Sequence, residues 1–188
     1  AMRYKEMGFS AQKWIIRHGP ASGHEGMKLN VEMVRTLRES LGDGYDIMID
    51  CWQGLNFDYA VDFASRIEEY RPRWLEECFM PDRIDSYVKL KAKTRIPLSG
   101  AEHEYTRWGF KRFVEKNALD ILQPDPYWCG GLSETVKIAA YATVHDLIII
   151  PHGHSTPLNI HFSAAQSPIH TPYQEYLTKW DDVNQHFL

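Results

Sequence analysis

The sequence has little of what marks several common protein classes. Its three cysteines, Cys51, Cys78 and Cys129, are widely spaced and form no CxxC pair, which argues against a disulfide framework and a cysteine-rich zinc site. The longest aliphatic stretch, 147–150, is far too short to span a bilayer. No secretory signal is visible either. We therefore expect a cytoplasmic protein with no membrane partner, whose thiols are buried and inert.

Charge of one sign is not concentrated anywhere in the chain. The 188 residues carry a formal net charge of −4, with basic and acidic residues interspersed. Because a nucleic-acid surface needs clustered Lys and Arg, we expect no nucleic-acid partner. Apolar residues make up 44% and charged residues 24%, the balance of an ordinary globular domain. The length suits one domain, or one larger domain cut short.

Apolar runs of strand length alternate with amphipathic stretches of helical length, without a linker. Such alternation predicts a parallel sheet, either doubly wound or closed into a barrel. Thr106 and Ser133 are placed to cap two of the helices, and Gly42 to stop another. The runs predict seven strands, near residues 9–16, 45–49, 74–75, 96–98, 121–122, 147–150 and 173–177.

The barrel is the favoured α/β fold because no GxGxxG turn follows the first strand. A TIM-type (β/α) barrel has eight strands and about 250 residues. Seven strands therefore predict an incomplete barrel, spanning about the second to the eighth strand. We expect the barrel to be open between its first and last strands. We also expect residues 1–188 to be part of a longer polypeptide, and not to fold alone into an active enzyme.

Acidic residues follow three successive strands at equal spacing. Asp50, Glu76 and Glu102 lie 26 residues apart, about the length of one strand–helix unit of a barrel. Each could be a solvated loop residue, but equal spacing favours carboxylates at one height that point to one spot. Their repulsion then requires a divalent cation, and oxygen ligation indicates magnesium. Glu77 competes with Glu76, but neighbouring strand residues face opposite ways and the spacing selects Glu76.

The same rhythm continues through the next three strands. Asp125 follows Glu102 by 23 residues, His152 follows Asp125 by 27, and Glu175 follows His152 by 23. An Asp and a His at neighbouring strand ends form a natural dyad. The carboxylate orients the imidazole and raises its basicity, so His152 is predicted to be a general base.

These features together resemble the enolase superfamily, in particular its mandelate racemase subgroup. The segment AEHEYTRWGF, residues 101–110, is similar to the subgroup's fifth-strand motif, with Ala101 where Gly is more usual. The resemblance covers essentially the whole chain. It implies that Asp50, Glu76 and Glu102 bind Mg²⁺, that Asp125 and His152 are the catalytic dyad, and that Glu175 hydrogen-bonds the substrate carboxylate.

Within the subgroup, KWIIRHGP, DCW, EEC, QPDPYWCGGL and PHGHS are similar to motifs of L-rhamnonate dehydratases. This resemblance implies removal of water from a sugar acid to give a 2-keto-3-deoxy acid. His152 takes the proton α to the carboxylate, magnesium stabilises the enediolate, and His152 then protonates the departing hydroxyl. The subgroup's second base, a Lys two residues after Lys13, is replaced by Ile15, so racemisation is not expected. Trp52 stands where many members have Asn.

The resemblance also implies that residues 1–188 are part of a C-terminal barrel domain, with an N-terminal capping domain and the first strand outside them. Because the capping domain shapes the substrate pocket, the particular sugar acid stays open. We expect a homo-oligomer at full length. Alternatives are a dehydratase of another aldonic or aldaric acid, a non-catalytic sugar-acid-binding barrel, and a purely structural role.

Overall fold

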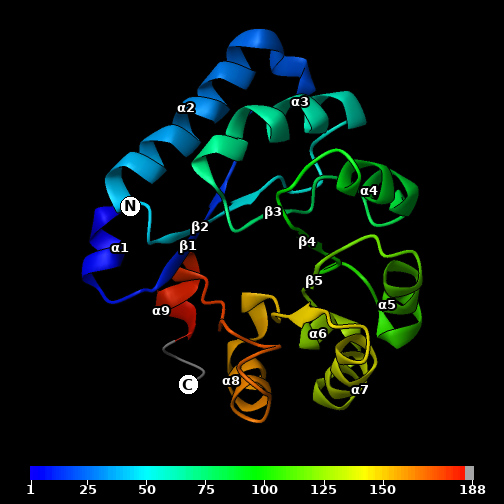
Figure 1. Ribbon diagram of the computed structural model, residues 1–188. Helices are drawn as coiled ribbons and strands as arrows, with labels where there is room; N and C mark the ends of the chain where they lie inside the picture. Colours follow the sequence, from blue (N-terminus) through cyan, green and yellow to red (C-terminus); the bar gives the residue numbers. More distant parts are fainter. Residues whose placement is uncertain (185–188) are drawn as a thin grey trace. The chain divides into compact units, whose positions relative to one another are not determined.

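The computed structural model describes residues 1–184, in which strands alternate with helices (Figure 1). The strands form one sheet in the order β1-β2-β3-β4-β5-β6, and β1–β2, β2–β3, β3–β4 and β5–β6 each pair in parallel. Because this order has two ends, the sheet is open, as predicted for an incomplete TIM-type barrel. The strands are β1 (Ala11–Ile15), β2 (Asp46–Asp50), β3 (Trp74–Glu76), β4 (Leu98–Gly100), β5 (Ile121–Leu122) and β6 (Ile148–Ile149).

The chain divides into two compact units, Ala1–Ser99 and Gly100–Leu188. Within residues 1–184, none of the helices has the length and apolar character needed to cross a bilayer. The first unit holds helices α1 (Met2–Glu6), α2 (Gly23–Leu41), α3 (Phe57–Ile67) and α4 (Ile84–Lys91), with 3-10 turns η1 (Pro20–Ser22) and η2 (Glu68–Tyr70). The second holds α5 (Thr106–Glu115), α6 (Pro126–Cys129), α7 (Leu132–Thr143), α8 (Thr156–Ala164) and α9 (Asp181–Asn184), with η3 (Gly153–Ser155) and η4 (Thr178–Trp180).

In the first unit, α2 and α3 lie side by side next to the strands (Figure 1). Helical spacing predicts one apolar face of α2 at Val31, Val34, Leu37 and Leu41; the last three are buried and Val31 is half-buried. Gly42 ends the helix with φ +85, as predicted, because glycine adopts this angle without steric cost. In β2 the residues 47–50 are all buried, which is typical of a strand covered on both faces.

In the second unit, α5 and α7 pack together, and the two predicted helix caps are wrong. The residue before α5 is Tyr105 and the one before α7 is Gly131, and neither of these two residues makes a side-chain cap hydrogen bond. The Thr106 hydroxyl accepts from the Trp108 N–H at 3.4 Å, from inside the helix. Thr106 already lies inside α5 with φ +54. The backbone N–H of Arg107 donates instead to Glu134 Oε1 at 2.9 Å. A side chain from the neighbouring helix thus satisfies a donor that local sequence could not.

The predicted seventh strand, near residues 173–177, is not formed. These residues are described, but they belong to no strand and none of them is buried. A parallel core strand is buried on both faces, and Pro172 lacks an N–H for a backbone ladder. Residues 173–177, predicted to be the last strand, therefore form a half-exposed segment of irregular backbone.

Left-handed residues follow three of the strands. Trp52 and Gln53 after β2 have φ +41 and +61, Glu77 after β3 has φ +42, and Ala101 after β4 has φ +73. This region favours glycine and costs other residues roughly 1–2 kcal/mol. In the family that this sequence resembles, Gly is more usual at the position of Ala101, and the backbone angle of Ala101 is one that suits Gly. The sharp change of direction at each strand end is thus built from strained residues.

Arg38 is a buried cation that ties the end of α2 to the following loops. Its side chain is 8% exposed and donates to the carbonyl oxygens of Tyr70 at 2.8 Å, Gly42 and Tyr45 at 2.7 Å, and Arg71 at 3.0 Å. Burial lowers the pKa of this guanidinium. One side chain therefore donates to four backbone carbonyls from two segments of the chain and joins them at the end of α2.

We expect Arg38→Met to destabilise the fold by about 2–4 kcal/mol, because the apolar side chain fills the space but removes the hydrogen bonds that Arg38 donates to four carbonyls. Urea unfolding of the full-length protein measures the effect. Arg35→Met is the matched control, since Arg35 lies on the same helix in exposed pairs with Glu32 and Glu39. It should leave the midpoint almost unchanged. Equal effects from the two variants would refute the structural role of Arg38.

Candidate active site

Two of the predicted metal ligands end neighbouring strands of the first unit. Asp50 is the last residue of β2 and Glu76 the last of β3, and the two are direct register partners. The sequence predicted this equal height from the spacing alone. Both residues are buried, with exposures of 6% for Asp50 and 0% for Glu76. Two carboxylates so placed require positive charge nearby.

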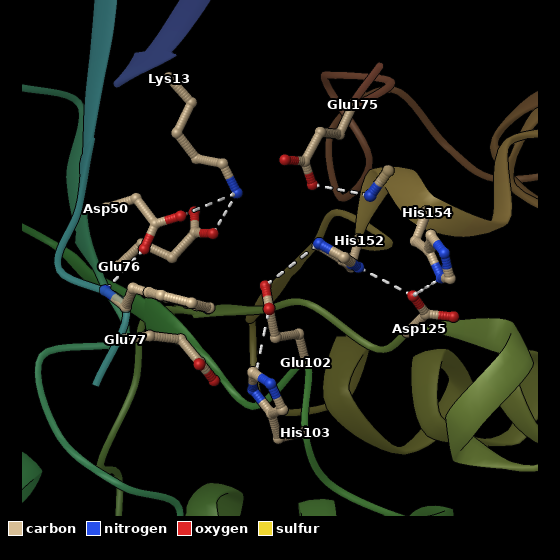
Figure 2. A network of polar contacts seen from close by, with 12 residues as sticks. Lys13, Asp50, Glu76, Glu77, Glu102, His103, Asp125, His152, His154 and Glu175 are labelled. Carbon is tan, nitrogen blue, oxygen red and sulfur yellow. Dashed lines mark hydrogen bonds and ion pairs between the residues drawn. The ribbon is translucent and has the colours of Figure 1, made fainter. Parts of the chain in front are cut away.

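Lys13 of β1 supplies a positive charge at these carboxylates. Its ammonium donates a hydrogen bond to Glu76 Oε1 and lies 3.8 Å from Asp50 Oδ2 (Figure 2). The indole Nε1 of Trp74 donates to the other oxygen of Glu76 at 2.9 Å. Asp50 and Glu76 thus face one point and share one cation there, an arrangement that fits an oxygen-liganded divalent metal.

Glu77 takes a different direction from Glu76. The strand ends at Glu76, and Glu77 follows with φ +42. Its carboxylate accepts a hydrogen bond from Gln53 Nε2 at 2.7 Å. Neighbouring residues of a strand face opposite ways, but β3 ends at Glu76, so strand alternation does not separate Glu76 from Glu77. The choice between them therefore depends on contacts, and the Glu76 carboxylate is in contact with the Lys13 ammonium.

The cysteines near these strands agree with the expectation of inert thiols. Cys51, Cys78 and Cys129 are all buried and free. The Sγ atoms of Cys51 and Cys78 are 3.9 Å apart. Contact with Cys78, together with burial, raises the pKa of Cys51 well above its usual value. A thiol with a raised pKa is a weak nucleophile at neutral pH.

In the second unit, Glu102 and Asp125 lie on opposite sides of the His152 ring (Figure 2). His152 Nδ1 is 2.8 Å from Asp125 Oδ2, and His152 Nε2 is 3.5 Å from Glu102 Oε2. Both carboxylates are buried, with exposures of 6% for Glu102 and 0% for Asp125. An ionised Asp125 only accepts hydrogen bonds, so the imidazole proton belongs on Nδ1 and the Nε2 lone pair is left to act as a base.

Asp125 is held by more than the imidazole. It precedes α6, and its Oδ1 accepts from the Tyr127 N–H at 2.8 Å and from the hydroxyl of Ser155. Burial raises the pKa of Asp125, but the hydrogen bonds from His152 and Ser155 outweigh this effect, so the net pKa lies below the usual carboxyl value. Asp125 therefore stays ionised and orients the imidazole at neutral pH.

Glu175 reaches this group from the irregular segment after α8. Its Oε2 accepts a hydrogen bond at 2.9 Å from the backbone N–H of Gly153, the residue that follows His152 (Figure 2). A Cβ at position 153 would lie 2.9 Å from Glu175 Cγ and 3.1 Å from Leu177 Cγ. Only glycine permits this close approach, so Gly153 fixes where the Glu175 carboxylate lies.

Several residues of the site were not found from the sequence. The ring of Trp128 lies 5.2 Å from that of His103 and 6.1 Å from that of His152, measured between centroids. His103 Nδ1 is also 3.7 Å from Glu102 Oε1. The signal for His103 was its place next to Glu102. Trp128 and Ser155 lie within the motifs QPDPYWCGGL and PHGHS, but only the fold shows that they contact the dyad.

The structure thus gathers the six predicted site residues into two groups, one in each unit. Asp50 and Glu76 meet at Lys13 in the first unit. Glu102 and Asp125 meet at His152 in the second, and Glu175 binds the backbone beside that histidine. The first group can hold a cation, and the second can transfer a proton.

Comparison with known proteins gives consistent matches. The family model described as Enolase C-terminal domain-like matches residues 1–187. An L-rhamnonate dehydratase of Saccharopolyspora erythraea is 39% identical over 175 residues, which are 92% of this chain and 44% of that protein. The chain therefore spans less than half the length of this curated relative.

Solved structures agree with the sequence matches. A crystal structure of rhamnonate dehydratase from Gibberella zeae complexed with Mg has a TM-score of 0.88 at 40% identity, covering 94% of this chain and 43% of that one. A 3,6-anhydro-D-galactonate cycloisomerase from Zobellia galactanivorans has a TM-score of 0.77 at 34% identity, covering 87% of this chain and 44% of that one.

Proposed function

The chain belongs to the Enolase C-terminal domain-like family, and on that premise we propose that it is the barrel portion of a magnesium-dependent sugar-acid dehydratase. The proposed reaction removes water from an L-rhamnonate-like acid and gives a 2-keto-3-deoxy acid. The names of relatives at 39% and 40% identity support this substrate. The observation that carries the proposal is the Asp125–His152 dyad, with its 2.8 Å contact and a second carboxylate at the far ring nitrogen.

We propose that Asp50, Glu76 and Glu102 hold the magnesium ion. The fit rests on the donor set: all three are buried carboxylates, and the first two already bind one cation, the Lys13 ammonium. When bound, Mg²⁺ would supply positive charge to the substrate carboxylate and favour loss of the proton next to it. The engagement of Lys13 by Asp50 and Glu76 supports a charge-balancing role for it rather than proton abstraction.

His152 is the proposed general base and then the general acid. Asp125 keeps the proton on Nδ1, so Nε2 takes the proton α to the substrate carboxylate. The resulting imidazolium, stabilised by Asp125, then gives a proton to the hydroxyl that departs from the next carbon. The enol that remains tautomerises to the 2-keto acid. Glu175, fixed by Gly153, is the proposed hydrogen-bond partner of the substrate carboxylate.

A panel of sugar acids tests the proposal in the full-length protein. We expect magnesium-dependent formation of a 2-keto-3-deoxy acid, with the highest kcat/KM for L-rhamnonate, and no turnover when EDTA removes the metal. One residue that serves as base and acid acts on one face of the substrate, so product stereochemistry in D₂O should show syn elimination. Magnesium-dependent binding of sugar acids without turnover would identify a binding barrel instead. Turnover of another aldonic or aldaric acid would correct the substrate alone.

A further inference from the structure

Ser155 stands at a helix start but does not act as a helix cap. It is the residue before α8, yet its side chain makes no cap hydrogen bond. Serine at this position normally accepts from a backbone N–H of the first turn. Here the hydroxyl instead donates to Asp125 Oδ1 and accepts from the Tyr127 N–H at 3.0 Å. Ser155 is fully buried. Its hydrogen bonds are therefore used on the dyad rather than on its own helix.

The two oxygens of Asp125 have separate partners. Oδ1 receives the Ser155 hydroxyl and the Tyr127 N–H, while Oδ2 is 2.8 Å from His152 Nδ1. His154 Nδ1 lies 3.8 Å from the same Oδ2, so a second imidazole is within reach of it. If the Asp125 carboxylate rotated, its contact with His152 would be lost. The two donors on Oδ1 oppose that rotation.

We propose that Ser155 is a positioning residue of the dyad. It holds the Asp125 carboxylate so that Oδ2 faces His152, which keeps the proton on Nδ1 and leaves Nε2 to accept the substrate proton. Ser155 does not touch the reacting atoms and acts only through Asp125. This inference rests on the proposed function for its catalytic consequence, but the tautomer of His152 is defined without any substrate.

A purely structural anchor predicts something different. Thr156, the next residue, has such a structural role, because its hydroxyl donates to the Gly153 carbonyl oxygen at 2.8 Å and so anchors the turn before α8. If Ser155 only anchored the turn before α8, removing its hydroxyl would lower stability and leave His152 unchanged. A positioning role requires that the imidazole itself respond.

Ser155→Ala in the full-length protein separates these readings. We expect kcat to fall on the order of tenfold with KM nearly unchanged, because the lost hydrogen bond orients the base rather than the substrate. Thr135→Val is the matched control, since Thr135 is equally buried in the same unit and its hydroxyl contacts Cys129 and Gly131, not the dyad. Its kcat should stay at the wild-type value. Thermal midpoints show whether both variants are folded.

Nuclear magnetic resonance of ¹⁵N-histidine-labelled protein, without substrate and at one pH, supplies a second readout. The wild type should show a slowly exchanging Nδ1–H resonance, assigned by its absence in His152→Asn. We expect Ser155→Ala to broaden or lose it and Thr135→Val to retain it. If folded Ser155→Ala retains this resonance, the proposal is wrong whatever happens to kcat. If the wild type turns over no sugar acid, the proposed function fails, while the resonance still decides the positioning role.

Discussion

His152→Asn is expected to lower turnover of the preferred sugar acid by at least about a thousandfold. The same imidazole takes one proton and delivers another, so its loss removes both transfers. Asparagine keeps a similar volume and a hydrogen-bonding group toward Asp125, and it leaves Asp50, Glu76 and Glu102 in place. Magnesium binding should therefore survive. Steady-state kinetics and titration calorimetry of the full-length protein measure the two effects separately.

The neighbouring side chains supply graded controls for this result. Asp125→Asn should cause a large but smaller loss, because it removes orientation and basicity while the base remains. His154→Asn should have little effect, since the His154 side chain is 42% exposed and its Nδ1, at 3.8 Å from Asp125 Oδ2, is too far away for a hydrogen bond. Near-normal dehydration by His152→Asn would refute the assignment and direct attention to Lys13 of β1 and to Arg17 and His18, which follow that strand.

The second large effect is expected at the metal. Glu76→Gln should weaken magnesium binding by more than about a hundredfold, since an amide replaces a charged ligand that is buried and cannot be substituted by solvent. Glu77→Gln is a closely matched control, because Glu77 is the next residue and also buried, with an exposure of 1%. It should retain most of the affinity. Calorimetric titration with MgCl₂ measures both variants.

The opposite result has a definite meaning. If Glu77→Gln loses the metal and Glu76→Gln keeps it, Glu77 is the ligand and the equal spacing that selected Glu76 was coincidental. If neither variant loses affinity, the proposed ligand set is wrong as a whole. Asp50→Asn then serves as the next variant, because Asp50 is the register partner of Glu76.

The strands and the heights of their carboxylates could be predicted because both depend on local pattern. Runs such as Ile47 to Ile49 are buried on both faces, and a repeating unit of fixed length brings Asp50 level with Glu76. The pairing of Asp125 with His152 follows from the same repeat, one unit further on. Features that recur with each strand–helix unit can therefore be predicted from the sequence.

The rest depends on contacts that no local pattern encodes. Ser155 matches a helix cap in sequence, but the fold places Asp125 within reach of its hydroxyl. Thr106 was a cap by residue type, yet its left-handed backbone and the distant Glu134 decided otherwise. Residues 173–177 were predicted to form a strand, but a strand also needs burial and a partner ladder, and none of these residues is buried. In each case tertiary contacts outweighed a valid local preference.

The left-handed residues that follow β2, β3 and β4 have a consequence for engineering. Trp52, Gln53, Glu77 and Ala101 lie next to or within three residues of the proposed ligands, and each holds an unfavourable backbone angle. Relaxing these turns would raise stability but also re-aim the carboxylates that precede or follow them. Attempts to stabilise this protein should therefore leave the strand ends unchanged and begin on the outer helices. At these four residues, a substitution that raises the thermal stability is expected to lower the affinity for the metal.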